Sequence, residues 1–260
     1  MTKPAITPAE RRYQDYLRQR GMRTANAYTR TLAKLRREEV ARVARLLVER
    51  YNPRQWELVA PVLVNEAAYL PKWYEGIIVA AGMPMIGPTA HQLGIPYEEV
   101  KPLAGYFEGE LTAYARDRAG AEISSVSGTM KETLQGILRE EVAADPNIGV
   151  DALSKKLRVG FEERNEWMAR RIAQTEMMNA LAEAGEETAE ALEVRYTKTW
   201  CISGLGNTRE THVAMDGVTI DQDGIFQLVD CVVRYPHDTR SNPPAGEIIN
   251  CACSCIRRPL

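Results

Sequence analysis

The sequence lacks a run of apolar residues long enough to cross a membrane. No stretch approaches the roughly 18 to 20 uninterrupted apolar residues that a spanning helix needs. The first residues, Met1 to Arg12, also lack the apolar core of a secretory signal peptide. We therefore expect no membrane partner, and a protein that folds in the cytoplasm or inside a particle assembled there.

Cysteine is absent from the first 200 residues, and all five cysteines lie in the last quarter of the chain: Cys201, Cys231, Cys251, Cys253 and Cys255. An odd number of cysteines, three of them in a Cys-x-Cys-x-Cys run, is a poor framework for a secreted disulfide scaffold. The pattern favours reduced thiols or a metal site.

Internal repeats and low-complexity tracts are absent too, and a length of 260 residues allows one large domain or two modest ones. The formal net charge of -2 conceals an asymmetry, because residues 1–60 carry fourteen Lys or Arg against six acids, a charge of +8, and the rest sums to -10. This segregation predicts a basic arm that meets nucleic acid or an acidic protein face, although a solvated helix face gives the same pattern. The candidate contact residues are Arg30, Arg36, Arg37, Arg42 and Arg45.

The first half of the chain reads as helix. Apolar residues recur at helical spacing over 24–51, and a second helical piece is predicted over 55–69. Glycine and proline are dense over 82–105, which predicts an irregular connection and a domain boundary.

Three helices that pack as a bundle are predicted next, one that starts at Thr129 and ends before Pro146, one over 150–159 and one over 162–192. Thr129 and Glu132 match a capping box, in which each side chain bonds a backbone donor at the helix start. The longest helix is predicted to direct four side chains inward: Trp167, Ile172, Met177 and Leu181.

After Val194 the composition changes to β-forming residues and turns, and strands are predicted over 196–200 and 227–233. The predicted fold class is therefore mainly α, with three consecutive regions: a basic helical arm and connecting region (1–110), a helical bundle (111–195) and a small Cys-rich α+β module (196–260).

The last region carries the most specific pattern. It contains, in order, Trp200, Thr208-Arg209, His212, Met215-Asp216-Gly217, Phe226, Tyr235-Pro236-His237-Asp238 and Glu247-Ile-Ile-Asn250-Cys251-Ala252-Cys253. With the preceding Arg-Ile-Ala-Gln-Thr-Glu helix at 171–176, this order resembles the Mu F-like head-morphogenesis family of phage minor head proteins. The resemblance covers about residues 120–258. Asn207, Ala252 and Gln174 depart from the family pattern.

The resemblance implies a virion protein at the capsid interior or portal vertex, made in the host cytoplasm. It implies a role in procapsid assembly and in DNA packaging or ejection, and contacts with the portal protein, the scaffold and the major capsid protein. It implies no catalytic reaction, so the chain is expected not to be an enzyme. The residues expected to build the module or its interfaces are Trp200, Arg209, His212, Asp216, Asp238, Glu247 and Asn250.

Other roles remain open for the chain. His212, Cys251 and Cys253, with Cys255 or His237, offer the soft ligands of a structural zinc site, and buried thiols beside a hydrogen-bonded histidine are the alternative. A DNA-binding packaging accessory would use the basic residues for non-specific phosphate contact. A metal-dependent hydrolase or nuclease would need clustered carboxylates, and a cysteine nucleophile would need a base beside Cys201 or Cys251.

Overall fold

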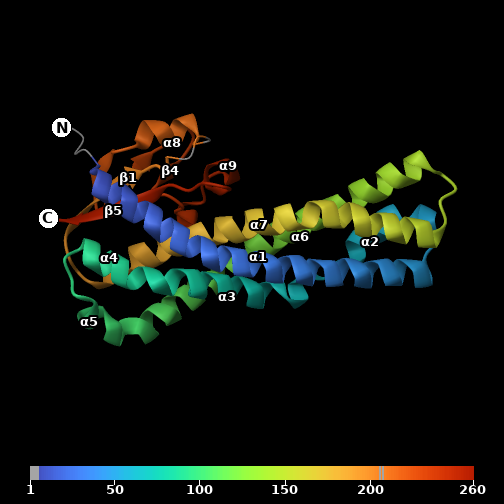
Figure 1. Ribbon diagram of the computed structural model, residues 1–260, viewed down its shortest axis with the longest axis horizontal. Helices are drawn as coiled ribbons and strands as arrows, with labels where there is room; N and C mark the ends of the chain where they lie inside the picture. Colours follow the sequence, from blue (N-terminus) through green and yellow to red (C-terminus); the bar gives the residue numbers. More distant parts are fainter. Residues whose placement is uncertain (1–5, 205, 207) are drawn as a thin grey trace. The chain divides into compact units, whose positions relative to one another are not determined.

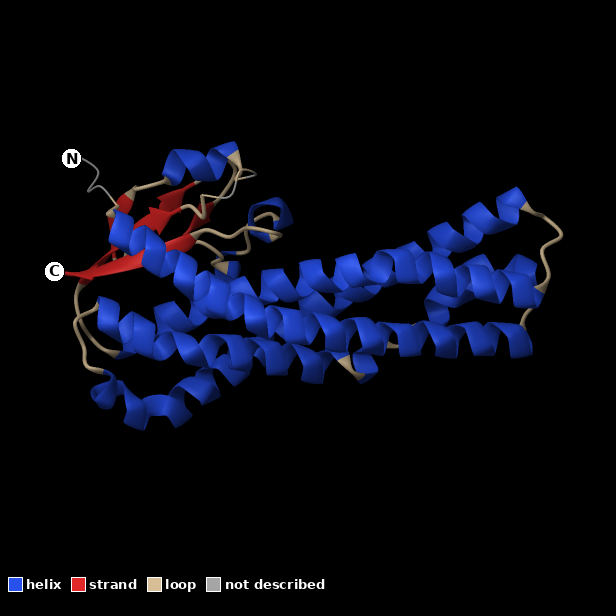
Figure 2. Cartoon of the chain, in the orientation of Figure 1, coloured by secondary structure: helices blue, strands red, loops and turns tan. Residues whose placement is uncertain are grey.

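The computed structural model describes residues 6–204, 206 and 208–260, with the backbone alone at residue 123. The chain is mainly helical, with 72% helix and 8% strand, and its strands lie in the C-terminal region (Figure 2). The predicted fold class is thereby confirmed. Lys3, from the basic segment, and Asn207, a departure from the family pattern, lie outside the described residues.

The helices before the C-terminal region are α1 (Pro8–Arg50), α2 (Trp56–Leu63), α3 (Leu70–Gly82), α4 (Ile86–Gln92), α5 (Tyr97–Val100), α6 (Ala104–Ala144) and α7 (Val150–Ala191), all visible in Figure 1. Four short 3-10 helices connect them: η1 (Pro53–Gln55), η2 (Glu66–Ala68), η3 (Met83–Met85) and η4 (Lys101–Leu103). The region over 82–105 is thus largely helical, and the irregular connection predicted there is wrong.

The first helix begins sixteen residues before its predicted start at Thr24. The amide and hydroxyl of Thr7 both donate to the Glu10 carboxylate at 2.8 Å, while the Glu10 amide donates to the Thr7 hydroxyl at 3.2 Å. Pro8 follows the cap, where its missing N–H costs nothing. These reciprocal bonds form a capping box, so the helix start lies at Thr7.

The capping box predicted at Thr129 does not form. The Thr129 hydroxyl donates to the Ser125 carbonyl at 3.1 Å, one turn earlier in α6. A threonine inside a helix bonds in this way, and the motif therefore does not mark a helix start by itself. The predicted end before Pro146 is correct, because α6 ends at Ala144.

The predicted break between residues 159 and 162 is also wrong, since α7 runs unbroken through both positions. Gly160 lies inside this helix for a packing reason. A Cβ atom there would stand 3.2 Å from the Ile137 side chain, tighter than ordinary van der Waals contact. The glycine lets α6 and α7 approach and does not end the helix.

Two compact units divide the chain, and neither is continuous in sequence. One comprises residues 1–26, 76–115 and 173–260, and the other comprises residues 27–75 and 116–172. We call them the module unit and the bundle unit. They do not coincide with the three consecutive regions expected from the sequence, because α1, α6 and α7 each contribute to both.

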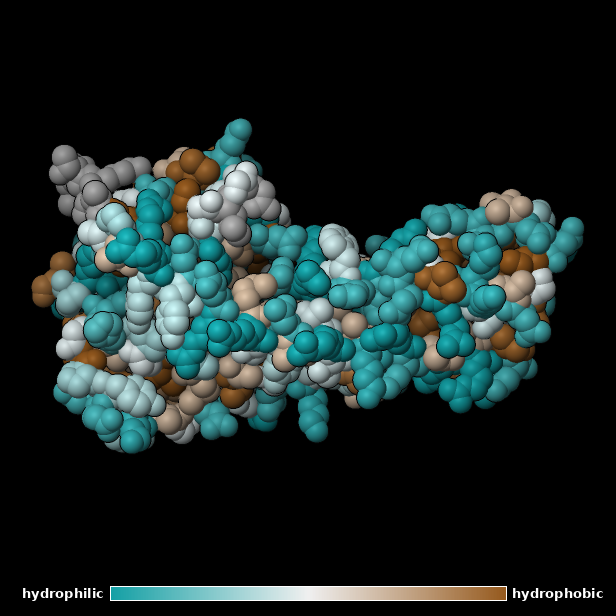
Figure 3. All heavy atoms as spheres, viewed as in Figure 1, coloured by the Kyte–Doolittle hydropathy of each residue, from teal (hydrophilic) through white to brown (hydrophobic). Residues whose placement is uncertain are grey.

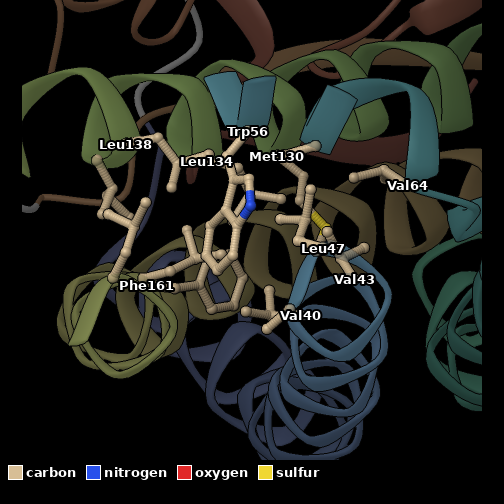
Figure 4. Close-up of a cluster of buried hydrophobic side chains, with 14 of the residues drawn as sticks. Val40, Val43, Leu47, Trp56, Val64, Met130, Leu134, Leu138 and Phe161 are labelled. Atoms are coloured by element: carbon tan, nitrogen blue, oxygen red, sulfur yellow. The ribbon is translucent and has the colours of Figure 1, made fainter. Parts of the chain in front are cut away.

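The bundle unit has a core built from α1, α2, α6 and α7. Figure 4 shows side chains from these elements pointing into one cluster, with Trp56 at its centre. Trp56 is fully buried, and its indole N–H donates to the Tyr51 carbonyl at 3.1 Å. An aromatic ring of this size supplies much of the apolar area that the unit buries.

One residue predicted to face inward in the bundle does not. Trp167 is 60% exposed and lies under the Arg171 guanidinium, whose carbon is 5.4 Å from the ring centroid. Its neighbour Met168 is buried instead, so the inward face is displaced by one residue there. Ile172 is half-buried, whereas Met177 and Leu181, in the module unit, are buried as predicted.

The C-terminal region contains a three-stranded antiparallel sheet of order β2-β1-β5, formed by β1 (Tyr196–Cys201), β2 (Thr219–Asp221) and β5 (Ser254–Pro259). The prediction of one strand over 227–233 is wrong. A hairpin occupies this stretch, in which β3 (Phe226–Gln227) pairs with β4 (Val232–Val233). The remaining elements are α8 (Glu210–Met215), η5 (Thr239–Ser241) and α9 (Ala245–Ile248).

Charged side chains join this sheet to the C-terminal part of α7. The Glu186 carboxylate accepts bonds from Lys198 at 3.0 Å and from Arg257 at 2.7 Å, and all three side chains are buried. Glu183, also buried, accepts the Tyr235 hydroxyl at 2.8 Å and the Arg240 guanidinium. The sheet is therefore fixed to α7 by the charge-assisted bonds of Glu186, which are shielded from water, and the loop after β4 is fixed by those of Glu183.

Hydrophilic residues cover most of the face drawn in Figure 3, and hydrophobic residues appear there in separate patches. None of the described helices is long and apolar enough to cross a membrane.

Trp56→Ala should lower the free energy of unfolding by about 3 to 5 kcal/mol, because it leaves a cavity in the bundle core. Urea unfolding followed by far-UV circular dichroism measures this loss. Leu58→Ala, on the same helix, is the matched control, since Leu58 is 73% exposed and should change stability by less than about 0.5 kcal/mol. Equal losses in the two variants would contradict this account of the core.

Glu187→Gln tests the electrostatics of α7. Burial raises the pKa of Glu187 from 4.5 to about 7, with the neighbouring Glu183 adding to the shift. The folded protein thus holds this proton more tightly than the unfolded chain, and stability present below pH 4.5 is lost as the pH rises through 7. Between low and high pH, the free energy of unfolding should therefore fall by about 1 to 2 kcal/mol less in the variant than in the wild type.

Urea titrations of the wild type and Glu187→Gln at pH 4 and pH 8 provide the measurement. Glu163→Gln is the control, because Glu163 is exposed on the same helix. An identical pH dependence in all three proteins would show that Glu187 does not titrate in this way.

Candidate metal centre

Three side chains from two separate segments meet in the module unit. His212 belongs to α8, while Cys251 and Cys253 lie between α9 and β5. Their donor atoms all lie within 4.8 Å of one another, and the three residues are buried. His212 Nδ1 is 3.5 Å from each of the two sulfur atoms. This cluster can hold a metal ion.

The segment that carries the two cysteines is shaped by its backbone contacts. Asn250 has a φ of 57°, in the left-handed region that asparagine tolerates better than most residues. Its amide donates to the Thr175 hydroxyl at 3.3 Å, and the Arg209 side chain donates to the Ile249 carbonyl. The contacts of Asn250 and Arg209 thus fix the backbone turn that precedes Cys251.

The ring of His212 is fixed on two sides. Its Nε2 lies 2.7 Å from the Glu247 carboxylate, and its plane meets the Trp200 ring edge-on, with the centroids 5.2 Å apart. A carboxylate only accepts hydrogen bonds, so Nε2 carries a proton and Nδ1 is left facing the sulfurs. Histidine ligands of metal ions are oriented by carboxylates in this way.

The two thiols differ in acidity because they bond each other. The hydrogen bond with Cys253 is the main cause that lowers the pKa of Cys251 well below its usual value, and a bond with His212 adds to it against the effect of burial. The same bond, together with burial, raises the pKa of Cys253. Burial alone would lower the pKa of His212, but its bonds to Cys251 and Glu247 raise it. The pair therefore stabilises a thiolate at Cys251, and the thiolate is the metal-binding form.

Two predicted module residues lie outside the cluster and bind other protein groups. Asp216 accepts bonds from Arg11 at 2.5 Å and from the Ile202 amide at 3.1 Å. Asp238 is fully buried and accepts the Arg234 amide at 2.9 Å. Neither carboxylate joins a cluster of acids of the kind a metal-dependent nuclease uses, among the residues whose side chains are described.

The remaining cysteines are not part of the cluster. Cys201 and Cys255 lie on β1 and β5, and Cys231 lies in the hairpin turn before β4. Burial raises the pKa of each of these thiols. The cysteine nucleophile considered at Cys201 therefore lacks a thiolate-stabilising neighbourhood.

The basic residues of α1 have different environments. Arg30, Arg37 and Arg45 are exposed. Arg36 is fully buried, with its Nε 3.1 Å from the buried Glu66 carboxylate, so its prediction as a contact for nucleic acid or a partner is wrong. Arg42 is half-buried and bonds Glu39 and the Leu63 carbonyl.

The first residues of α1 do not form a free arm either. Residues 8–26 belong to the module unit, where Arg11 binds Asp216 and Arg18 donates to the Ser203 carbonyl at 3.1 Å. The arm predicted from charge alone is therefore part of a folded core.

Sequence reasoning missed the polar face of α7. Asn179, Glu183 and Glu186 are all buried and all contact the C-terminal region. The sequence does carry a signal for this face. The three polar residues are spaced by four and three residues on an alanine-rich helix, and side chains at these intervals share one helix face.

No protein-family model, no curated protein and no solved structure matches this chain. The resemblance to the Mu F-like family therefore depends on the motif residues, and the function follows as a proposal from their arrangement.

Proposed function

We propose that the chain is a minor head protein of a tailed bacteriophage, located at the capsid interior or portal vertex. It binds the portal protein and acts in procapsid assembly and in DNA packaging or ejection. The observation that carries this proposal is that motif residues far apart in the sequence gather at one buried cluster.

The motif residues support one another through direct contacts. Trp200 packs on His212, His212 bonds Glu247, and both cysteines lie beside His212. Arg209 and Asn250 hold the turn before the first cysteine. An order of short motifs that arose by chance would not be expected to bring its members together, so the contacts support a shared module with the phage family.

The proposed role is structural, without a catalytic step. The cluster is closed to solvent, since Cys251 is 6% exposed and His212 and Cys253 are each 2% exposed. The hydrogen-bonded chain of Glu247, His212 and Cys251 has the order of a base-activated nucleophile. The Cys253 thiol, however, contacts the same nitrogen of His212, Nδ1. Two sulfur atoms beside one imidazole nitrogen suit the binding of a metal ion better than a nucleophilic attack on a substrate.

The metal proposed for this cluster is a structural zinc ion held by His212, Cys251 and Cys253. Thiolate and imidazole are the ligands that zinc prefers in proteins. Zinc would tie together segments that otherwise share a small apolar core around Trp200.

A basic surface on the bundle unit is the proposed contact for an acidic partner. Arg30, Lys34, Arg37 and Arg45 are exposed on α1 at spacings of four, three and eight residues, which place them on one face. Arg37 also lines a groove of about 420 Å³ with Lys155 and Arg158. Glu38 and Glu162 pair with Lys34 and Arg37, so the positive charge is partly neutralised.

A DNA-binding packaging accessory is the second candidate, favoured by the same basic surface. Lys and Arg displace counterions from DNA wherever they approach the phosphates, without reading the sequence. Binding to DNA would weaken steeply with salt, which distinguishes it from a specific protein contact.

Co-expression with the portal protein of the same phage, followed by native mass spectrometry, tests the proposal. We expect a defined complex, and about tenfold or greater weakening for the double variant Arg30→Glu/Arg45→Glu. Arg164→Glu/Arg170→Glu is the control with the same change of charge, because both arginines are exposed on α7 of the bundle unit.

Three outcomes separate the possibilities. Weakening by the first variant alone supports both the function and the surface. A complex unaffected by either variant keeps the head-protein function and overturns the basic surface as its contact. Absence of any complex with the portal, together with salt-sensitive retention of DNA, overturns the assignment in favour of the packaging accessory.

A further inference from the structure

A groove of about 420 Å³ lies in the bundle unit, between α1 and the first part of α7. Arg37 and Val40 line it from α1, and residues between 151 and 162 line it from α7. Its volume falls within the range of about 300 to 1,000 Å³ that is usual for binding sites. The basic surface of α1 reaches this groove at Arg37.

The α7 wall of the groove carries a stripe of charged residues. They are spaced by four, three and four residues, which places them on one face of the helix. The members of the stripe are Asp151, Lys155, Arg158 and Glu162. Because a helix rises about 1.5 Å per residue, the stripe is about 16 Å long and covers about three turns.

The two basic residues in the middle of the stripe are available to a partner. Lys155 and Arg158 are exposed, and neither has an ion-pair partner among the residues that the structure describes. Glu162, at one end, is already paired with Arg37 at 3.3 Å. The unpaired positive charge of the stripe is therefore concentrated at Lys155 and Arg158.

The floor of the groove is apolar. Val40 and Phe161 line it, and both belong to the hydrophobic core of the bundle unit shown in Figure 4. Val159 is also part of the lining, and at 51% exposed it offers apolar surface to a ligand. The groove thus combines an apolar contact with two adjacent positive charges.

Contacts between α1 and α7 fix the shape of the groove. The Asn165 amide donates to the Ala33 carbonyl at 2.8 Å, and the asparagine is buried. The Arg36 guanidinium, also buried, lies over the Phe161 ring, 5.7 Å from its centroid. A site that is formed before its ligand arrives loses less conformational entropy on binding.

We infer that this groove binds an acidic amphipathic helix of a partner protein, whose carboxylates meet Lys155 and Arg158 and whose apolar side chains meet Val159. A helix that lays its apolar face into a groove is a common mode of recognition. The length of the stripe suits about three turns of such a helix. The inference deepens the proposed function and rests on it for the identity of the partner, the portal protein.

The distribution of charge favours a protein helix over DNA. Carboxylates stand at both ends of the stripe, at Asp151 and Glu162. A DNA backbone carries a phosphate at every step, so some phosphates would meet these acids. A helix places its own acids opposite Lys155 and Arg158 and other residues opposite the two ends.

Fluorescence anisotropy with the full chain tests the inference by means of two labelled peptides. One is a helix of about 15 residues in which Leu and Glu recur at spacings of three and four. The other has the same composition in scrambled order. We expect saturable binding of the patterned peptide and at least about 10-fold weaker binding of the scrambled one, because only the pattern gathers each residue type on one face.

Two changes in the groove should weaken binding of the patterned peptide. Lys155→Glu/Arg158→Glu should do so at least about 10-fold, since both charges are reversed. Val159→Ser should do so at least about threefold, because apolar contact is lost. Arg164→Glu/Arg170→Glu, exposed on α7 outside the groove, is the control and should bind like the wild type. All these side chains are exposed, so far-UV circular dichroism should show unchanged folding.

Each remaining outcome counts against the inference. Equal binding of the two peptides, wild-type affinity in Lys155→Glu/Arg158→Glu, or no saturable binding of the patterned peptide would overturn the groove as a helix site. Tighter binding of random-sequence duplex DNA, lost in the same variant, would assign the groove to phosphate contact instead. None of these measurements uses the portal protein, so the head-protein function is judged separately, by mass spectrometry of the complex.

Discussion

The C-terminal region depends on polar side chains of α7 that are withdrawn from water. Glu186 binds Lys198 and Arg257, and Glu183 binds Tyr235. Removing one partner of a buried ion pair commonly costs about 3 to 5 kcal/mol, because the other charge remains buried. The same pair contributes little net stability compared with apolar residues of equal volume. What these pairs determine is where the short sheet lies on the helix.

A further polar contact extends the same helix face by one turn. Asn179 lies four residues before Glu183 and contacts His237, as Glu183 contacts Tyr235 two residues earlier in that loop. The loop is thus bound to α7 at two points.

Local patterns predicted well the features that neighbouring residues decide. The strand at 196–200, the end of a helix before Pro146 and the mainly helical class all follow from short-range propensity. The capping box shows the limit of such patterns. Thr7 and Thr129 both precede a glutamate by three residues, yet only Thr7 caps a helix, because the chain before Thr129 continues a helix begun at Ala104.

By itself, the sequence determined the fold class, the place of the β-forming module and the residue types that meet at the cluster, because composition and spacing encode these directly. The tertiary structure decided which side chains are buried together. Arg36 is hidden beside Glu66 and not displayed with its basic neighbours. Cys251 and Cys253 cluster with His212, and Cys255 and His237 are not part of that cluster. These contacts join residues tens of positions apart, and the order of neighbours along a chain does not specify such pairs.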